Sequence, residues 1–361
     1  VVDEDEEEDR PEERHELLGA CAQQRRGRLV AEVGADHFNR VGAGVHQIDT
    51  GTFEYFVEWL GYGLFPWSAV VPLALVAAVA ALRTDPTVGL IATSRGQDRT
   101  PDPLGDRFRS LDITIAVDIE AIFEATRPDV VIHTAAMTNV DACELDPLAC
   151  HLQNVTATDN LVKASVKQNA HFIHLSTDFI FDGESGPYME EDRPAPLSIY
   201  GQSKLDAERI VMESGLSKWA IARTIIVYGV AEGLSRSNVI LWAKSALEKG
   251  QPIKVVDDQW RMPTLAEDLA DGCIRIARRG ATGVFNLSGP DGMSILELVQ
   301  RVGAFFQLDT SVITVVKSDT LGQPARRPPR TGFILDKARR ELGYAPHRFE
   351  EGLAVVAEQL K

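Results

Sequence analysis

At 361 residues the chain is longer than a typical single domain of roughly 100–200 residues, so we expect a main domain with a smaller lobe or appendage. Its hydrophobic fraction of 44% and charged fraction of 25% are those of a globular protein and exclude disorder along most of the length. The net charge is −16, and no Lys- and Arg-rich stripe with interleaved aromatic residues is present, which argues against nucleic-acid binding.

The N-terminal residues 1–58 are predicted to be an acidic segment that is disordered or atypical. Residues 3–9 are all acidic, and no sustained helical or strand period follows them. The glycines Gly42 and Gly44 have no recognisable strand before them or helix after them, so they do not indicate a phosphate-binding turn.

Residues 59–82 contain no charged residue, and by length alone they could span a bilayer. Pro66 and Pro72 interrupt this stretch, and it runs directly into a predicted buried strand at 88–93. We therefore favour a buried helix at the start of a soluble α/β domain over a membrane span.

Strands and helices alternate through residues 59–229. The strands are continuous apolar runs, which is typical of a parallel sheet covered by helices on both faces, so we predict a doubly wound, Rossmann-like domain. Asp146 followed by Pro147 marks the start of a long helix. The predicted strands are 88–93, 109–111, 130–134, 171–176 and 219–227, and the predicted helices are 118–126, 147–168 and one that includes residues 200–208.

The composition changes in residues 230–361, where the loops are richer in Pro and Arg. We predict a smaller C-terminal substrate-binding lobe, with some of its segments returning to the Rossmann-like domain and a cleft at the carboxyl edge of the sheet. Its predicted elements are 238–249, 253–256, 265–278, 284–287 and 295–306.

Four cysteines occur without a Cys-x-x-Cys pair or a neighbouring His at metal-ligand spacing. They indicate reduced thiols in a cytoplasmic protein and no metal site. These residues are Cys21, Cys143, Cys150 and Cys273.

The strongest chemical signal is Tyr200 and Lys204, which a helix places one turn apart on the same face. A lysine cation close to a tyrosine favours the phenolate and brings the phenol pKa toward the working range of a proton carrier. Thr177 and Asp178 end a predicted strand, where a hydroxyl can hydrogen-bond a substrate carbonyl. The alternatives are a surface Tyr and Lys pair, and a Thr-Asp pair that caps a loop.

Residues 174–183 (HLSTDFIFDG) and 200–208 (YGQSKLDAE) resemble the dTDP-4-dehydrorhamnose reductase family of extended short-chain dehydrogenases/reductases. The resemblance covers roughly residues 85–360. It includes PDVVIHTAA at 128–136, Val227-Tyr-Gly229 and Arg327-Pro328.

This resemblance implies NAD(P)H-dependent reduction of a 4-keto nucleotide sugar, with Thr177, Tyr200 and Lys204 as the catalytic residues and Asp178 near the sugar. Ser94 and Arg95 end a predicted strand at a cationic position suited to a 2′-phosphate, so NADP is favoured while NAD is left open. The implied cofactor-binding residues are Ser94, Arg95, Asp112, Ala135, Ala136, Thr138, Tyr200 and Lys204.

For Arg327, which stands in a cluster with Arg326 and Arg330, we predict recognition of the substrate diphosphate or closure of the lobe over the nucleotide. The alternative is a solvated loop. The partner expected is a nucleotide-sugar substrate, and a homodimer is left open.

The chain departs from the family at two places. The expected Gly-x-x-Gly-x-x-Gly turn should fall near residues 61–74, where bulky side chains stand instead. Either dinucleotide binding has been lost, or this N-terminal sequence is not the one that the organism translates. The second departure is Ile226, at a position where family members place a tryptophan against the substrate.

Two other functions are compatible with the same residues. The first is a non-catalytic, NADP-binding regulatory subunit similar to the beta subunit of methionine adenosyltransferase. The second is a nucleotide-sugar epimerase or dehydratase, since fold analogy does not separate these activities.

Overall fold

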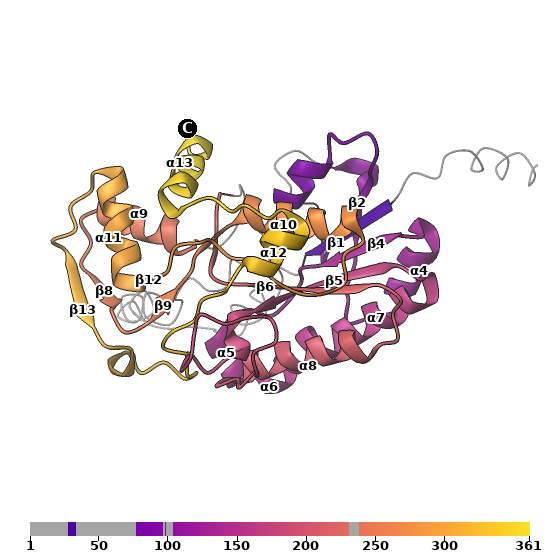
Figure 1. Ribbon diagram of the computed structural model, residues 1–361, viewed down its shortest axis with the longest axis horizontal. Helices are drawn as coiled ribbons and strands as arrows, with labels where there is room; N and C mark the ends of the chain where they lie inside the picture. The colour runs from indigo at the N-terminus through magenta and orange to yellow at the C-terminus, as the bar shows by residue number, and fades with distance from the viewer. Residues whose placement is uncertain (1–27, 34–76, 97, 99–103, 231–237) are drawn as a thin grey trace, which may run out of the picture.

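The computed structural model describes the backbone of residues 28–33 and all of residues 77–96, 98, 104–230 and 238–361. Figure 1 shows a sheet with helices on both faces and a smaller group of elements beside one end of it. This arrangement confirms the predicted α/β class with a parallel sheet.

The main sheet has seven strands in the order β11-β6-β5-β4-β1-β2-β3, and every neighbouring pair is parallel. The order β3-β2-β1-β4-β5-β6 is that of the doubly wound dinucleotide-binding fold. The interior strand β5 is buried along its whole length, so its sequence shows no alternation of buried and exposed residues. The strands are β1 (Arg28–Val33), β2 (Gly89–Ser94), β3 (Phe108–Ser110), β4 (Val130–His133), β5 (His171–Thr177), β6 (Trp219–Thr224) and β11 (Gly283–Asn286).

Helices cover both faces of this sheet (Figure 1). One face packs against α4 (Ala116–Thr126), α7 (Ala157–Gln168) and α8 (Ile199–Glu213). The other packs against helical residues 77–82, α10 (Ala266–Arg279) and α12 (Asp336–Leu342). The predicted long helix consists of α6 (Pro147–His151), a π-helical turn at Leu152–Thr156 and α7. Asp146 caps α6, because its side chain accepts a hydrogen bond from the Ala149 amide at 2.9 Å.

Strand β1 corrects our placement of the start of the domain. Residues 28–33 belong to the range 1–58 that we expected to precede the sheet, yet β1 pairs with both β2 and β4 in the middle of it. Arg28 and Glu32 interrupt the apolar run by which a buried strand is recognised, so this strand could not be identified from its pattern. The remainder of the range 1–58 and the expected glycine turn at 61–74 lie outside the described residues.

The smaller lobe has its own apolar core, formed largely by α9, α11 and α13 with the strands beside them. Segments α10, β11 and α12 also come from residues after 230, but they pack on the main sheet. The lobe elements are α9 (Val239–Glu248), β8 (Ile253–Val256) paired with β13 (Ile313–Val316), β9 (Trp260–Arg261) paired with β12 (Met293–Ser294), β7 (Val227–Tyr228) paired with β10 (Thr264–Leu265), α11 (Ile295–Phe306) and α13 (Phe349–Gln359).

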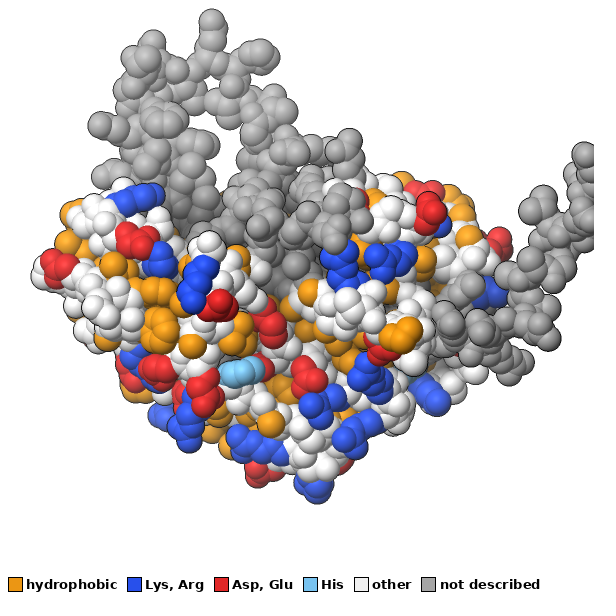
Figure 2. Space-filling view, turned by 90° about the horizontal axis from the view of Figure 1, so that it is seen from above, with side chains coloured by type: hydrophobic (Ala, Val, Ile, Leu, Met, Phe, Trp, Pro, Cys, Tyr) orange, Lys and Arg blue, Asp and Glu red, His pale blue; other side chains and the backbone are white. Residues whose placement is uncertain are grey.

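On the face seen in Figure 2, described acidic and basic side chains are intermingled among apolar ones rather than gathered by sign. Within the part of the chain that the structure describes, no helix has the length and apolar character needed to cross a membrane.

Candidate active site

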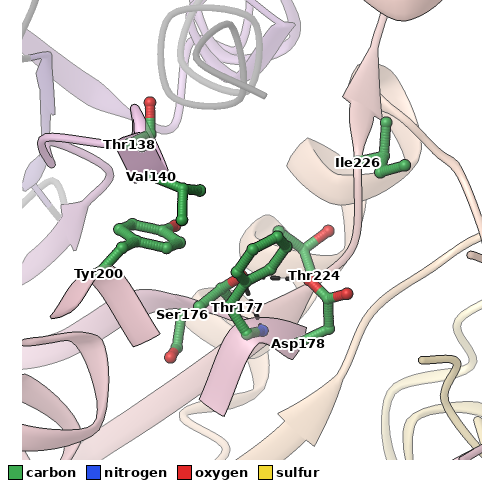
Figure 3. Close-up of a pocket in the computed structure, with 9 residues that line it drawn as sticks. Thr138, Val140, Ser176, Thr177, Asp178, Tyr200, Thr224 and Ile226 are labelled. Atoms are coloured by element: carbon green, nitrogen blue, oxygen red, sulfur yellow. Dashed lines mark hydrogen bonds between the residues drawn. The ribbon is translucent and has the colours of Figure 1, made fainter. Parts of the chain in front are cut away.

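A pocket opens at the carboxyl edge of the main sheet, where ligands of open α/β sheets bind (Figure 3). Its walls come from the segments that follow β4, β5 and β6 and from the start of α8. The lining residues are Thr138, Val140, Ser176, Thr177, Asp178, Phe179, Tyr200, Thr224 and Ile226.

Tyr200 stands in the first turn of α8, which Ser198 caps by accepting from the Gly201 amide at 3.2 Å. A β-carbon at Gly201 would lie 2.2 Å from the carbonyl oxygen of Phe179, so only glycine lets α8 begin this close to the segment after β5. This close approach sets the Tyr200 ring edge-on to Phe179, with 5.7 Å between ring centroids.

Burial raises the pKa of the Tyr200 phenol, while a hydrogen bond with Thr177 pulls this pKa in the opposite direction. The phenol is therefore protonated at neutral pH. A protonated phenol is the form that can donate a proton to a developing alkoxide.

Lys204 lies one turn further along α8 and is almost completely buried. Its Nζ is 3.1 Å from Nε2 of His174 on β5. An ammonium group has only donors, so Nε2 of His174 accepts and the ring proton resides on Nδ1. Burial lowers the pKa of Lys204 to about 8, against the opposing effects of Glu208 and Cys150.

Thr177 ends β5 and caps the short 3-10 turn Asp178–Ile180. Its Oγ1 accepts from the Phe179 amide at 3.2 Å and donates to Oδ1 of Asp178 at 3.1 Å. The threonine thus caps a turn, and it also lines the pocket, where its contact with a substrate carbonyl stays a prediction. Burial raises the pKa of the Asp178 carboxyl, and the Arg261 guanidinium together with the hydrogen bonds to this carboxyl opposes that shift.

The residues expected to hold a cofactor follow neighbouring strands at the same edge of the sheet. Ser94 ends β2 and is buried, and the next residue, Arg95, forms an ion pair with Asp112 at 3.1 Å between Nε and Oδ2. Oδ1 of Asp112 also accepts from the amide and the hydroxyl of Thr114.

Three further expected residues follow β4. Ala135 is buried, Ala136 comes next in the chain, and Thr138 lines the pocket. The structure therefore brings Thr138 together with Thr177, Asp178 and Tyr200, while Arg95 lies further along the edge, at the ends of β2 and β3.

Arg327 does not line this pocket. Its Nη1 and Nη2 lie 3.1 Å and 2.6 Å from the two carboxylate oxygens of Asp141 in α5 (Val140–Leu145), and the two side chains are only 4% and 9% exposed. Arg330, its neighbour in the predicted cluster, packs over the ring of Trp260. The guanidinium of Arg327 fastens the lobe to α5 in this structure.

Sequence reasoning gave no role to His174, Val140 or Phe179. His174 is part of the recognised motif, but its contact with Lys204 joins residues 30 positions apart and could not be read from the spacing. Ile226 lines the pocket with a backbone φ of 25°, which is unfavourable for a β-branched residue, so this position is strained. The only sequence signal there is the departure from the family tryptophan.

The strand order of the sheet, with a buried Tyr200 and Lys204 on one helix at its carboxyl edge, defines the class as an extended short-chain dehydrogenase/reductase fold. The RmlD substrate binding domain model matches residues 77–361. The chain belongs to this family.

Named relatives fall into two groups. Methionine adenosyltransferase 2 subunit beta of Xenopus laevis is 31% identical over 225 residues, which cover 61% of this chain and 67% of the relative. The dTDP-4-keto-6-deoxy-D-glucose reductase of Streptomyces niveus is 30% identical over 239 residues, which cover 66% of this chain and 81% of the relative.

A solved structure also aligns with the chain. This is a dTDP-4-dehydrorhamnose reductase from Bacillus anthracis in complex with NADP, with a TM-score of 0.68 and 21% identity, covering 92% of this chain and 99% of that one. At this level of identity the likeness concerns the fold.

Proposed function

We propose that the chain reduces a 4-keto nucleotide sugar with NAD(P)H, using Thr177, Tyr200 and Lys204 as its catalytic residues. The observation that carries the proposal is the pocket at the carboxyl edge of the sheet, where the Tyr200 phenol and the Thr177 hydroxyl meet. The Streptomyces relative, whose name describes reduction of a 4-keto sugar nucleotide, supports this choice of substrate class.

The residues at the edge fit a dinucleotide and its partner substrate. The small side chains of Ala135 and Ala136 follow β4, and Arg95 supplies a cation at the end of β2. Ser176 also lines the pocket, and its buried hydroxyl has no hydrogen-bond partner among the described residues. A bound NAD(P)H supplies the hydride for the carbonyl carbon.

In this mechanism Tyr200 donates its phenolic proton to the carbonyl oxygen as that oxygen becomes an alkoxide. The Thr177 hydroxyl donates a hydrogen bond to the same oxygen and polarises the carbonyl. The Lys204 ammonium, buried on the same face of α8, stabilises the phenolate that Tyr200 leaves behind and holds the nicotinamide ribose.

We propose NADP rather than NAD as the cofactor because Arg95 offers a guanidinium for a 2′-phosphate. The Bacillus anthracis structure, which contains NADP, supports this preference. Arg95 is paired with Asp112 in this structure, so a bound 2′-phosphate would compete with that carboxylate for the guanidinium. We also assign Ser94 and Thr138 to the binding of this cofactor. Asp178 remains a proposed substrate contact, whereas the engagement of Arg327 by Asp141 argues for a structural role of Arg327.

The test is the Tyr200→Phe variant, assayed by NADPH oxidation with dTDP-4-keto-6-deoxy-D-glucose. We expect turnover to fall by about 10²- to 10⁴-fold, the usual contribution of a positioned proton donor. Tyr228→Phe is the matched control, because Tyr228 is equally buried but lies outside the pocket. Full turnover by Tyr200→Phe would overturn the assignment.

The Xenopus relative favours a second candidate, a regulatory subunit that binds NADP without turning over a sugar. This candidate is supported if the chain binds NADPH in calorimetry, reduces no 4-keto nucleotide sugar and changes the kinetics of a methionine adenosyltransferase catalytic subunit. Turnover of the sugar nucleotide would remove it as the sole function.

A further inference from the structure

The carboxylate of Asp178 connects the catalytic strand to the C-terminal lobe. Oδ1 of this carboxylate accepts from the Thr177 hydroxyl at 3.1 Å, and Oδ2 accepts from the Thr331 hydroxyl at 2.5 Å. Nε of Arg261 lies 3.7 Å from Oδ2. Figure 3 shows Thr177 between Tyr200 and Asp178.

The lobe holds Thr331 rigidly. The Thr331 amide donates to the carbonyl of Trp260 at 3.0 Å, and the Trp260 amide donates to the carbonyl of Pro329 at 2.8 Å. The side chain of Arg261, which is fully buried, donates to the carbonyls of Trp260 and Pro328 at 2.7 Å each. Neither Thr331 nor Arg261 lines the pocket. The Thr331 hydroxyl contacts the pocket residue Asp178, and Arg261 contacts both Asp178 and the ring of Phe179.

The hydroxyl of Thr177 has a single hydrogen, and Asp178 competes with a substrate carbonyl for it. Donors on Oδ2 draw negative charge from the whole carboxylate, so Oδ1 attracts the Thr177 hydrogen less strongly. Thr331 and Arg261 therefore determine how firmly Asp178 retains the Thr177 hydrogen and in which direction the carboxylate is turned.

We propose that Thr331 is a positioning residue for the reduction: its hydroxyl fixes Asp178 so that the Thr177 hydroxyl can turn toward the substrate carbonyl. The inference rests on the proposed function. It makes the rate of the chemical step depend on a residue of the lobe that touches neither the substrate nor the cofactor.

The experiment compares Thr331→Val, which keeps the shape and removes the hydroxyl, with Thr331→Ser, which keeps the hydroxyl. Both are assayed by NADPH oxidation with dTDP-4-keto-6-deoxy-D-glucose, and thermal melting checks that they are folded. We expect Thr331→Val to lower kcat by about 10- to 100-fold, the worth of a hydrogen bond to a charged group, with KM for NADPH unchanged. Thr331→Ser should keep kcat within about threefold of the wild type by the same reasoning.

Thr320→Val is the matched control, since the Thr320 hydroxyl bonds only the carbonyl of Lys317 on an exposed turn. If Thr331→Val does not fold, Thr331→Ala replaces it in the same comparison. With an active wild type, two results overturn the inference. The first is a wild-type kcat in the variant that lacks the hydroxyl. The second is a serine variant that melts at the wild-type temperature and is as slow as the valine variant. A wild-type chain without turnover overturns the proposed function and this inference with it.

Discussion

The ion pair between Arg327 and Asp141 allows a sharp test of what this arginine does. Asp141→Asn keeps the side-chain shape and removes the negative charge opposite a guanidinium that is 4% exposed. Oδ1 of Asp141 also accepts a hydrogen bond from the Ala325 amide at 3.1 Å, and the substitution weakens this acceptor. Breaking one partner of a buried pair costs about 3–5 kcal/mol. Since asparagine retains one acceptor and Asp141 is 9% exposed, we expect a loss of about 3 kcal/mol, the lower end of that range.

The free energy of unfolding from urea titration gives this magnitude. The double variant Asp141→Asn with Arg327→Met should recover most of the loss, because it leaves no unpaired buried charge. Calorimetric titration with dTDP completes the design, and we expect Arg327→Met to bind dTDP as the wild type does. A variant Arg327→Met with normal stability but lost affinity for dTDP would refute this reasoning and restore the diphosphate role predicted from the sequence.

Two further predictions concern α8. Glu208 is fully buried against Arg223, with Oε2 of Glu208 2.8 Å from Nη2 of Arg223. Glu208→Gln should therefore lower the free energy of unfolding, measured by urea titration, by about 3–5 kcal/mol. The control Glu248→Gln, at an exposed pair with Lys244, should lower it by less than about 0.5 kcal/mol. Because burial lowers the pKa of Lys204 to about 8 and the ammonium is the active form, kcat/KM should be maximal below that pH and fall as the pH rises through it. Glu208→Gln should move this fall in kcat/KM to lower pH, because Glu208 raises the pKa of Lys204. A kcat/KM that stays flat up to about pH 9.5 would contradict the assigned role of Lys204.

Most of the main sheet could be predicted from the sequence because its strands are buried on both faces and therefore appear as unbroken apolar runs. The predicted strand 171–176 is β5, at His171–Thr177, and the predicted helix 265–278 is α10, at Ala266–Arg279. The short pairings of the lobe could not be predicted in this way. Two-residue strands such as β7 and β10 are too short for a period, and they exist because their partners are brought together by the rest of the fold.

Local spacing also placed Tyr200 and Lys204 on one face of a helix and Thr177 at the end of a strand, as the structure has them. The contacts that decide the electrostatics are not local. Arg327 and Asp141 are 186 positions apart, and Thr331 and Asp178 are 153 apart. A run of arginines in one sequence looks the same whether it meets a phosphate or a buried carboxylate, and only the fold separates the two.

Strand β1 changes where the phosphate-binding turn of this chain should be sought. In a doubly wound sheet that turn follows the first strand, and the pairing of Val33 with Ser94 places the end of β1 at the carboxyl edge beside the end of β2. The residue after β1 is Gly34, and the positions three and six further on are His37 and Arg40 instead of glycine. Counted from the end of β1, the Gly-x-x-Gly-x-x-Gly pattern therefore keeps its first glycine and lacks the other two. In such a turn the first glycine serves the tight bend, and the later ones serve backbone approach to the pyrophosphate and packing of the helix, so the sequence after β1 lacks the two glycines that favour pyrophosphate binding.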